Sequence, residues 1–119
     1  MAKKILIVDD NPNMSSLLQE MLEVFDYESV RAGDGAEALS ELEKGTFSMV
    51  ITDMRMPNMS GLELIDEVKA RYPKMPVVLI SGYSVSEIDA QPGSHKADGF
   101  LGKPLMMSDI EKMLNTLLR

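Results

Sequence analysis

The sequence contains no cysteine, so it can form neither a disulfide framework nor a thiolate metal site. It also lacks long apolar runs. The run that begins at Ile5 ends after four residues, at Asp9, and is too short for a signal peptide. No stretch approaches the roughly 20 apolar residues of a membrane span. From these absences we expect a cytoplasmic protein with no membrane partner.

Positive charge is also scarce. Only 12 lysine and arginine residues stand against 19 aspartate and glutamate residues, which leaves a net charge of −7. Nucleic-acid binding needs a clustered basic face, and the basic residues are scattered along the chain. We therefore expect no nucleic acid partner. The composition, 45% hydrophobic and 26% charged, excludes a disordered chain.

The length of 119 residues is enough for one domain with a buried core and too short for two. The sequence shows no internal repeat, no low-complexity segment and no linker. It ends within the last predicted helix. We therefore expect one domain over residues 1–119, with no output domain attached.

Short apolar runs alternate with amphipathic segments along the chain. The apolar runs are typical of strands buried on both faces. The expected strands are residues 5–8, 27–32, 49–52, 76–80 and 100–101. Between most of these strands, apolar residues recur at helical spacing. The expected helices are residues 12–25, 36–44, 60–69 and 108–117.

Capping signals support several of these helices. Asn11–Pro12 reads as an N-cap followed by proline at the first helical position, and Ser60–Glu63 and Ser108–Glu111 have capping-box spacing. Ser84–Glu87 has the same spacing, but Pro92–Gly93 would stop that helix early. We therefore predict a short or irregular fourth helix.

Strands that alternate with helices predict an α/β fold, with a parallel sheet, right-handed crossovers and helices on both faces. Residues 27–32 are less apolar than the other strands, which places that strand nearer an edge.

Polar side chains follow four of the predicted strands. Asp9 and Asp10 follow the first strand, Asp53 the third, Ser81 the fourth and Lys103 the fifth. In an open parallel sheet the carboxyl ends of the strands form the ligand crevice. Each residue alone is weak evidence, because an aspartate after a strand is more often a cap or turn residue. Together they predict one site.

The residue types in this set suit phosphoryl chemistry. Crowded carboxylates repel one another and need a hard cation, and Mg²⁺ prefers oxygen ligands and keeps water ligands. Asp9 and Asp10 would hold the ion, while Asp53 would be both ligand and nucleophile, forming an aspartyl phosphate. The ion, the Lys103 ammonium and the Ser81 hydroxyl would neutralise the phosphoryl oxygens.

Four motifs contain these residues, in order along the chain. They are Ile7-Val8-Asp9-Asp10, the segment Asp53-Met54-Arg55-Met56-Pro57-Asn58-Met59-Ser60-Gly61, Ile80-Ser81-Gly82 and Lys103-Pro104. With these motifs the sequence resembles the receiver domain of two-component response regulators over essentially its whole length. The resemblance implies a flavodoxin-like, doubly wound sheet of five parallel strands in the order 2-1-3-4-5.

The resemblance also implies the roles of the acidic residues. Asp53 would be phosphorylated by a histidine kinase or a phosphotransfer protein. Asp10 and Asp53 would ligate Mg²⁺ directly, Asp9 mainly through water, and the backbone carbonyl of Arg55 would be another ligand. The domain would signal to an unknown downstream protein, as a monomer or as a phosphorylation-dependent dimer. It would not be an enzyme with an external substrate.

Four further expectations follow from the resemblance. Ser81 would move toward the phosphoryl group. Phe100 would be the switch aromatic that turns inward on activation, although a plain core aromatic fits its position as well. The bond between Lys103 and Pro104 would be cis. The short fourth helix would alter a face that receiver domains commonly use for dimerisation or docking.

Three other functions stay open. A hydrolase of the haloacid-dehalogenase type also forms an aspartyl phosphate, but Arg55 stands where that chemistry needs an acidic residue. A flavodoxin-like FMN carrier needs a phosphate-binding loop after the first strand, where Asp9 and Asp10 would repel phosphate. The third is a receiver that binds partners without being phosphorylated.

Overall fold

The computed structural model describes residues 3–56, 58–82 and 96–118. Their five strands are all parallel and form one sheet in the order β2-β1-β3-β4-β5, as predicted. The strands are β1 (Lys4–Val8), β2 (Glu28–Ala32), β3 (Met49–Asp53), β4 (Val77–Ser81) and β5 (Gly99–Gly102). The less apolar β2 lies at an edge of the sheet, so that prediction is confirmed.

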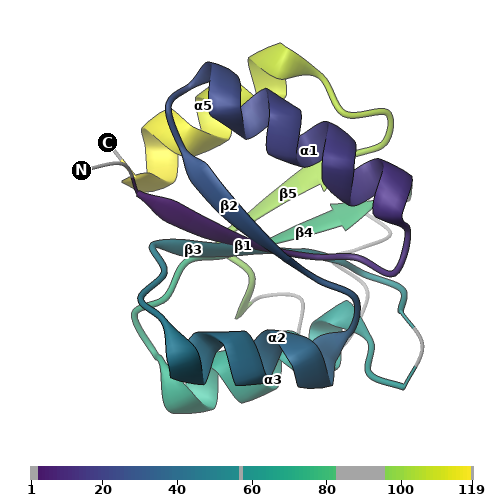
Figure 1. Ribbon diagram of the computed structural model, residues 1–119, viewed down its shortest axis with the longest axis vertical. Helices are drawn as coiled ribbons and strands as arrows, with labels where there is room; N and C mark the ends of the chain where they lie inside the picture. Colours follow the sequence, from purple (N-terminus) through teal and green to yellow (C-terminus); the bar gives the residue numbers. More distant parts are fainter. Residues whose placement is uncertain (1–2, 57, 83–95, 119) are drawn as a thin grey trace.

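The described helices cover both faces of the sheet (Figure 1). α1 (Pro12–Val24) and α5 (Met107–Leu118) lie on one face, and α2 (Gly35–Lys44) and α3 (Gly61–Arg71) lie on the other. The predicted short helix after Ser84 lies outside the described residues. None of the helices in the described ranges has the length and hydropathy needed to span a bilayer.

Local capping starts α1 and α3 where the sequence predicted. The Asn11 side-chain oxygen accepts hydrogen bonds from the backbone N–H groups of Asn13 and Met14, at 3.0 and 3.4 Å. Ser60 and Glu63 form the predicted capping box of α3. These caps fix the helix starts directly after the ends of β1 and β3, because each satisfies N–H groups that a helix leaves unpaired.

The capping box predicted at the start of the last helix is wrong. α5 begins at Met107, so Ser108 lies inside its first turn and is not the N-cap. The backbone N–H of Ile110 donates to the carbonyl of Met106 at 3.1 Å. That hydrogen bond is the first of the helix, and its acceptor, Met106, lies two residues before the predicted cap Ser108.

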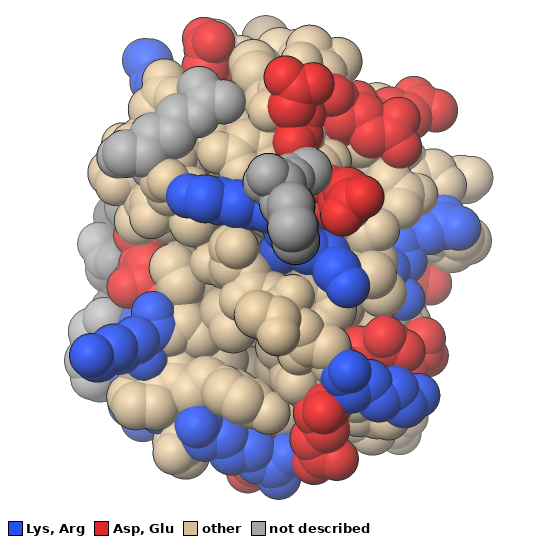
Figure 2. Space-filling view, turned by 60° about the vertical axis from the view of Figure 1, so that its left-hand side comes forward, with Lys and Arg blue, Asp and Glu red and all other residues tan. Residues whose placement is uncertain are grey.

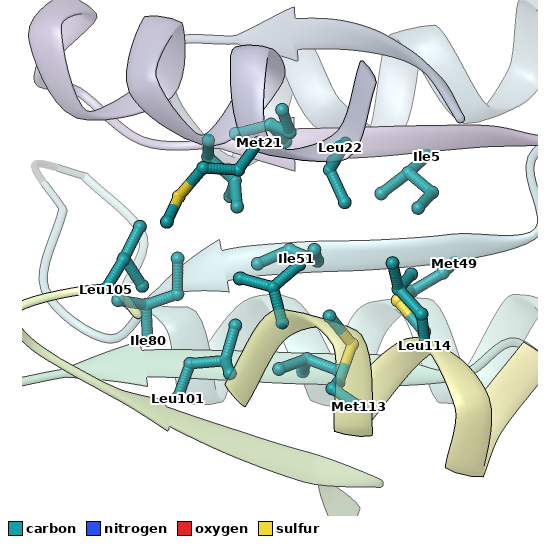
Figure 3. Close-up of a cluster of buried hydrophobic side chains, with 14 of the residues drawn as sticks. Ile5, Met21, Leu22, Met49, Ile51, Ile80, Leu101, Leu105, Met113 and Leu114 are labelled. Carbon is teal, nitrogen blue, oxygen red and sulfur yellow. The ribbon is translucent and has the colours of Figure 1, made fainter. Parts of the chain in front are cut away.

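Two hydrophobic clusters, one on each face of the sheet, form the core. β1 contributes Ile5 and Ile7 to the cluster beneath α1 and α5, and Leu6 and Val8 to the cluster beneath α2 and α3. Figure 3 shows the first cluster, with Ile51 of the central β3 among the side chains of α1 and α5. Because both faces of β1, β3 and β4 are buried, these three strands read as continuous apolar runs.

Replacing Ile51 by alanine tests the position of the core. Ile51 is fully buried, so Ile51→Ala should lower the free energy of unfolding by about 3 kcal/mol through lost burial and a residual cavity. Val24 is 66% exposed, and Val24→Ala should change it by less than about 0.5 kcal/mol. Urea denaturation followed by circular dichroism measures both. Equal effects of the two substitutions would contradict this core.

Candidate functional site

Asp9, Asp10 and Asp53 come together at the carboxyl ends of β1 and β3. These strands are neighbours, and Val8 pairs with Thr52, so the next residues, Asp9 and Asp53, stand at the same level. One carboxylate oxygen from each of the three residues lies within 4.8 Å of the others. Asp9 and Asp53 are buried and Asp10 is exposed, so the cluster opens to solvent on one side.

Both carboxylate oxygens of Asp53 have a hydrogen-bond donor. The Lys103 ammonium lies 3.3 Å from Oδ2, and the backbone N–H of Arg55 donates to Oδ1 at 3.3 Å. Lys103 follows β5, and its own backbone N–H donates to the carbonyl of Ser81 at 3.0 Å. The end of β5 is thereby tied to the ends of β3 and β4.

The Asp9 carboxylate has one paired oxygen and one unpaired oxygen among the described residues. Its Oδ1 accepts a hydrogen bond from the backbone N–H of Asn11 at 2.9 Å. Its Oδ2 is buried and has no hydrogen-bond partner among the described residues. Burial raises the pKa of the Asp9 carboxyl, the hydrogen bond from Asn11 opposes this shift, and the negative charge of Asp53 adds to it. A cation would relieve both the repulsion and the unpaired oxygen.

The remaining predicted residues lie on β4 and β5. Ser81 is buried at the end of β4, one residue beyond Ile80, which pairs with Asp53. Phe100 pairs with Leu79, further from the crevice, and packs half-buried against the cluster beneath α2 and α3. Phe100 is therefore not in the carboxylate cluster. The Lys103–Pro104 bond is cis, the isomer that the resemblance implied.

Two contacts to the backbone of Asp53 were not predicted. A Cβ at Gly61 would lie 2.3 Å from the backbone oxygen of Asp53 and 2.9 Å from Cα of Met54. The Thr52 hydroxyl donates to the same backbone oxygen at 3.0 Å. The first turn of α3 thus lies directly against the end of β3, where only glycine fits. The sequence signal was a glycine just after the Ser60 cap, but it did not reveal what the glycine approaches.

Residues 5–115 match the family model of the response regulator receiver domain. The chain belongs to this family. The receiver domain is 33% identical to the response regulator protein PilR of Pseudomonas aeruginosa, over 98% of this chain and 26% of PilR. The chain spans about a quarter of the length of the curated relatives that it matches. Membership of the family makes the chain a signalling module of two-component systems.

Solved structures share the fold of this receiver domain. The chemotaxis protein CheY4 of Vibrio cholerae has a TM-score of 0.91 at 29% identity, over 99% of this chain and all of that one. The response regulator TrrA of Thermotoga maritima, in complex with Mg²⁺-BeF, has a TM-score of 0.90 at 34% identity, over 98% of this chain and 99% of TrrA. TrrA is also solved in complex with the histidine kinase ThkA. The predicted flavodoxin-like fold is confirmed.

Removal of the Asp9 charge should stabilise the metal-free receiver domain at neutral pH. Because the folded state raises the pKa of Asp9 above its usual value of 3.8, the stability it contributes is present below that value and is lost as the pH rises through the raised pKa. Asp9→Asn should raise the free energy of unfolding in EDTA by about 1 kcal/mol at pH 7. The gain should shrink near pH 4. Thermal unfolding at both pH values measures it.

The exposed Glu20 of α1 offers a matched control for Asp9→Asn. Glu20→Gln removes the same formal charge outside the cluster, and it should change the unfolding temperature little at either pH. A loss of stability at pH 7 in Asp9→Asn, without metal, would contradict the prediction that the charged Asp9 carboxylate lowers the free energy of unfolding.

Gly61→Ala tests the contact between α3 and β3. The added Cβ meets backbone atoms, which cannot rotate away, so the substitution should lower the free energy of unfolding by about 2 kcal/mol. At Gly33 a Cβ would meet only the flexible Glu37 carboxylate, at 3.6 Å. Gly33→Ala should therefore be close to neutral in the same urea titration. A neutral Gly61→Ala would contradict the close approach.

Proposed function

We propose that this receiver domain, comprising residues 1–119, accepts a phosphoryl group on Asp53 in a Mg²⁺-dependent reaction. The donor is the phosphohistidine of a histidine kinase or a phosphotransfer protein, and a downstream protein reads the resulting change. The environment of Asp53 carries the proposal. Its carboxylate is buried, has two acidic neighbours within 4.8 Å, and faces the Lys103 ammonium at 3.3 Å.

The acidic cluster suits a hard cation. It offers three carboxylates in close reach, one of them with a buried oxygen that lacks a partner among the described residues. Asp10 and Asp53 would hold Mg²⁺ directly, Asp9 would hold it through water, and the backbone carbonyl of Arg55 would be a further ligand. Bound there, the ion would neutralise charge on the carboxylates and on the incoming phosphoryl oxygens.

Asp53 supplies the nucleophile. One carboxylate oxygen forms a bond to phosphorus while the bond between phosphorus and the donor imidazole nitrogen breaks. The backbone N–H of Arg55 orients Oδ1, and the Lys103 ammonium, now at Oδ2, can shift to a phosphoryl oxygen. The hydroxyl of Ser81, on the neighbouring strand, would donate to another phosphoryl oxygen. By contacting the phosphoryl oxygens, these groups would stabilise the trigonal phosphoryl group during its transfer to Asp53.

The same contacts give phosphorylation a route to the surface. Lys103 bonds both the Asp53 carboxylate and the Ser81 carbonyl, so a new group on Asp53 acts on the ends of β4 and β5 together. Phe100 lies on β5 and is only half-buried. Its rotation inward, with movement of Ser81, would change the surface beside β5.

Exposed apolar side chains provide a surface for the phosphoryl donor. Leu17 of α1 and Met107 of α5 are 44% and 38% exposed, and Met106 just before α5 is 54% exposed. α1 and α5 cover the same face of the sheet, and each begins after a strand whose end forms the crevice. A donor docked on these helices would reach Asp53. The complex of TrrA with ThkA supports a kinase as the donor.

Labelling with radioactive acetyl phosphate tests the proposal. In Mg²⁺ the parent should become labelled, whereas Asp53→Asn should lose the label by about 100-fold because an amide is not a nucleophile. EDTA should have the same effect on the parent. Asp66→Asn, which alters an exposed aspartate on α3, should label like the parent.

Two results would overturn the assignment. Equal labelling of Asp53→Asn and the parent would place the phosphoryl group elsewhere. A parent that takes no label in Mg²⁺, from either acetyl phosphate or a phosphorylated histidine kinase, would indicate a receiver that binds its partners without phosphorylation.

A further inference from the structure

The side chains of β5 specify its register only weakly. The strand has four residues, Gly99–Gly102, lies at an edge of the sheet, and has one buried side chain, that of Leu101. A short strand with two glycines sets little preference for one alignment on its neighbour. Yet β5 leads directly to Lys103, whose ammonium lies 3.3 Å from the Asp53 carboxylate. The position of Lys103 therefore depends on how the start of β5 is fixed.

Asp98, the residue before β5, fixes that start. Its backbone N–H donates to the carbonyl of Val77 at 2.8 Å, and its Oδ2 accepts the backbone N–H of Val77, also at 2.8 Å. Both backbone polar groups of the first residue of β4 are thus paired with one residue. Val77 is fully buried, so loss of the carboxylate would deprive a buried N–H of its hydrogen bond. These two bonds define the alignment in which Val78 pairs with Gly99.

Lys69 of α3 holds the Asp98 carboxylate in place. Its ammonium lies 2.7 Å from Oδ2 of Asp98 and donates to the backbone carbonyl of Met75, also at 2.7 Å. The Lys69 side chain is 19% exposed and that of Asp98 36%, so the pair is partly shielded from water and salt. Oδ2 of Asp98 therefore has two donors, one from α3 and one from β4. We call Lys69 and Asp98, with their bonds to residues 75 and 77, the β5 anchor.

The β5 anchor lies at the end of the molecule where the strands begin, opposite the carboxylate cluster. Figure 2 shows both acidic and basic side chains at this end. A surface of mixed sign has no long-range field that would select a partner for Asp98, so the close contact with Lys69 decides the pairing. The four residues of β5 then cross the sheet from the anchor to the crevice.

A second ion pair joins the same two segments but lacks the features of the anchor. The Lys96 ammonium lies 2.5 Å from Oδ1 of Asp66, which stands one turn before Lys69 on α3. Both side chains are more exposed, at 43% and 54%, and no backbone N–H within the described ranges donates to the Asp66 carboxylate. Exposed pairs of this kind contribute little. The Lys96–Asp66 pair is therefore a matched control for the anchor.

We propose that Asp98 and Lys69 are positioning residues for phosphoryl transfer, a role that rests on the proposed phosphorylation of Asp53. The alignment of β5 that they fix places the Lys103 ammonium at the Asp53 carboxylate. Neither residue touches the reacting atoms. They act through Lys103, whose charge would stabilise the phosphoryl oxygens during transfer.

The geometry sets the size of the expected effect. A strand advances about 3.3 Å per residue, so a slip by one residue would carry the Lys103 backbone away from the Ser81 carbonyl. The Lys103 N–H now donates to that carbonyl at 3.0 Å. A full slip would also turn Leu101 out of the core, but a displacement of about 1 Å is enough to lower a rate by up to about 100-fold. Loss of the anchor should therefore slow labelling while the protein stays folded.

The rate of labelling by radioactive acetyl phosphate in Mg²⁺ tests this role. Asp98→Ala should lower the rate constant about tenfold and Lys69→Met about threefold, because alanine removes both bonds to Oδ2 and methionine only one of them. Asp98→Asn keeps an oxygen that accepts the Val77 N–H, so its rate should lie within about threefold of the parent. Asp66→Asn, which breaks the exposed control pair, should label at the parent rate.

A double-mutant cycle separates positioning from a loss of stability. If Asp98 acts through Lys103, Asp98→Ala should slow labelling by less than about twofold in a protein that already carries Lys103→Ala. A purely structural role of Asp98 would give its full loss in both backgrounds. The rates are compared at a temperature where circular dichroism shows every variant to be folded.

Hydrogen exchange of backbone amides follows the alignment of β5 without any phosphoryl group. In Asp98→Ala the Lys103 amide, at the far end of the strand, should exchange about tenfold faster, because its bond to the Ser81 carbonyl depends on the alignment. The Met54 amide, which donates to the Ile80 carbonyl, measures the overall loss of stability and should accelerate at least about threefold less.

The outcomes distinguish this role from the proposed function. A parent that takes label as fast as Asp98→Ala does would overturn the positioning role and leave the phosphorylation of Asp53 intact. The same conclusion would follow from an equal loss with and without the Lys103 ammonium, from a loss in Asp66→Asn as large as in Asp98→Ala, or from unchanged exchange at Lys103. A parent that takes no label would overturn the proposed function, and the positioning role with it.

Discussion

Asp9, Asp10 and Asp53 bring three like charges within 4.8 Å of one another at the carboxyl ends of β1 and β3. In an unfolded, hydrated chain these carboxylates would lie apart. In the folded protein the buried residues of β1 and β3 hold their backbone positions close together. The result is an edge where the folded state by itself is electrostatically unfavourable. Burial raises the pKa of the Asp9 carboxyl and the negative charge of Asp53 adds to that shift, while Oδ2 of Asp9 has no hydrogen-bond partner among the described residues. The chemistry proposed for Asp53 depends on this repulsion, because crowded carboxylates favour a bound cation, and the cation in turn would offset the charge of an incoming phosphoryl group.

Asp53 has two sets of contacts, one to its backbone oxygen and one to its carboxylate. Gly61 and Thr52 fix its backbone oxygen against the first turn of α3, which leaves the carboxylate little freedom to move away. Lys103 contacts the carboxylate itself, and its backbone N–H bonds the carbonyl of Ser81. One side of the site therefore fixes the backbone of Asp53, and the other side links its carboxylate to the ends of β4 and β5. Under the proposed phosphorylation, the change of charge at Asp53 would act on the ends of β4 and β5.

Structural features that depend on residues close together in the chain could be predicted directly from the sequence. The apolar runs of β1, β3 and β4 indicate strands buried on both faces, and the Asn11 and Ser60 caps act within three residues, so composition and spacing suffice to place them. The polar residues after these strands could be assigned to one crevice, because all strands of a parallel sheet end at the same edge. The prediction that Ser108 caps the last helix was wrong for an equally local reason. The N–H of Ile110 donates to the Met106 carbonyl, so the helix begins before Ser108.

Other features depend on which distant segments meet, and the tertiary structure decided them. The approach of Gly61 to Asp53 requires α3 to fold back onto the end of its own strand. The segments before β3 and β4 lie side by side because Val50 pairs with Val77. By itself the sequence determined the alternation of strands and helices and the set of acidic and basic residues at the strand ends, because spacing and residue type carry that information. The distances, burial and pairings that make those residues a site arise only from long-range packing.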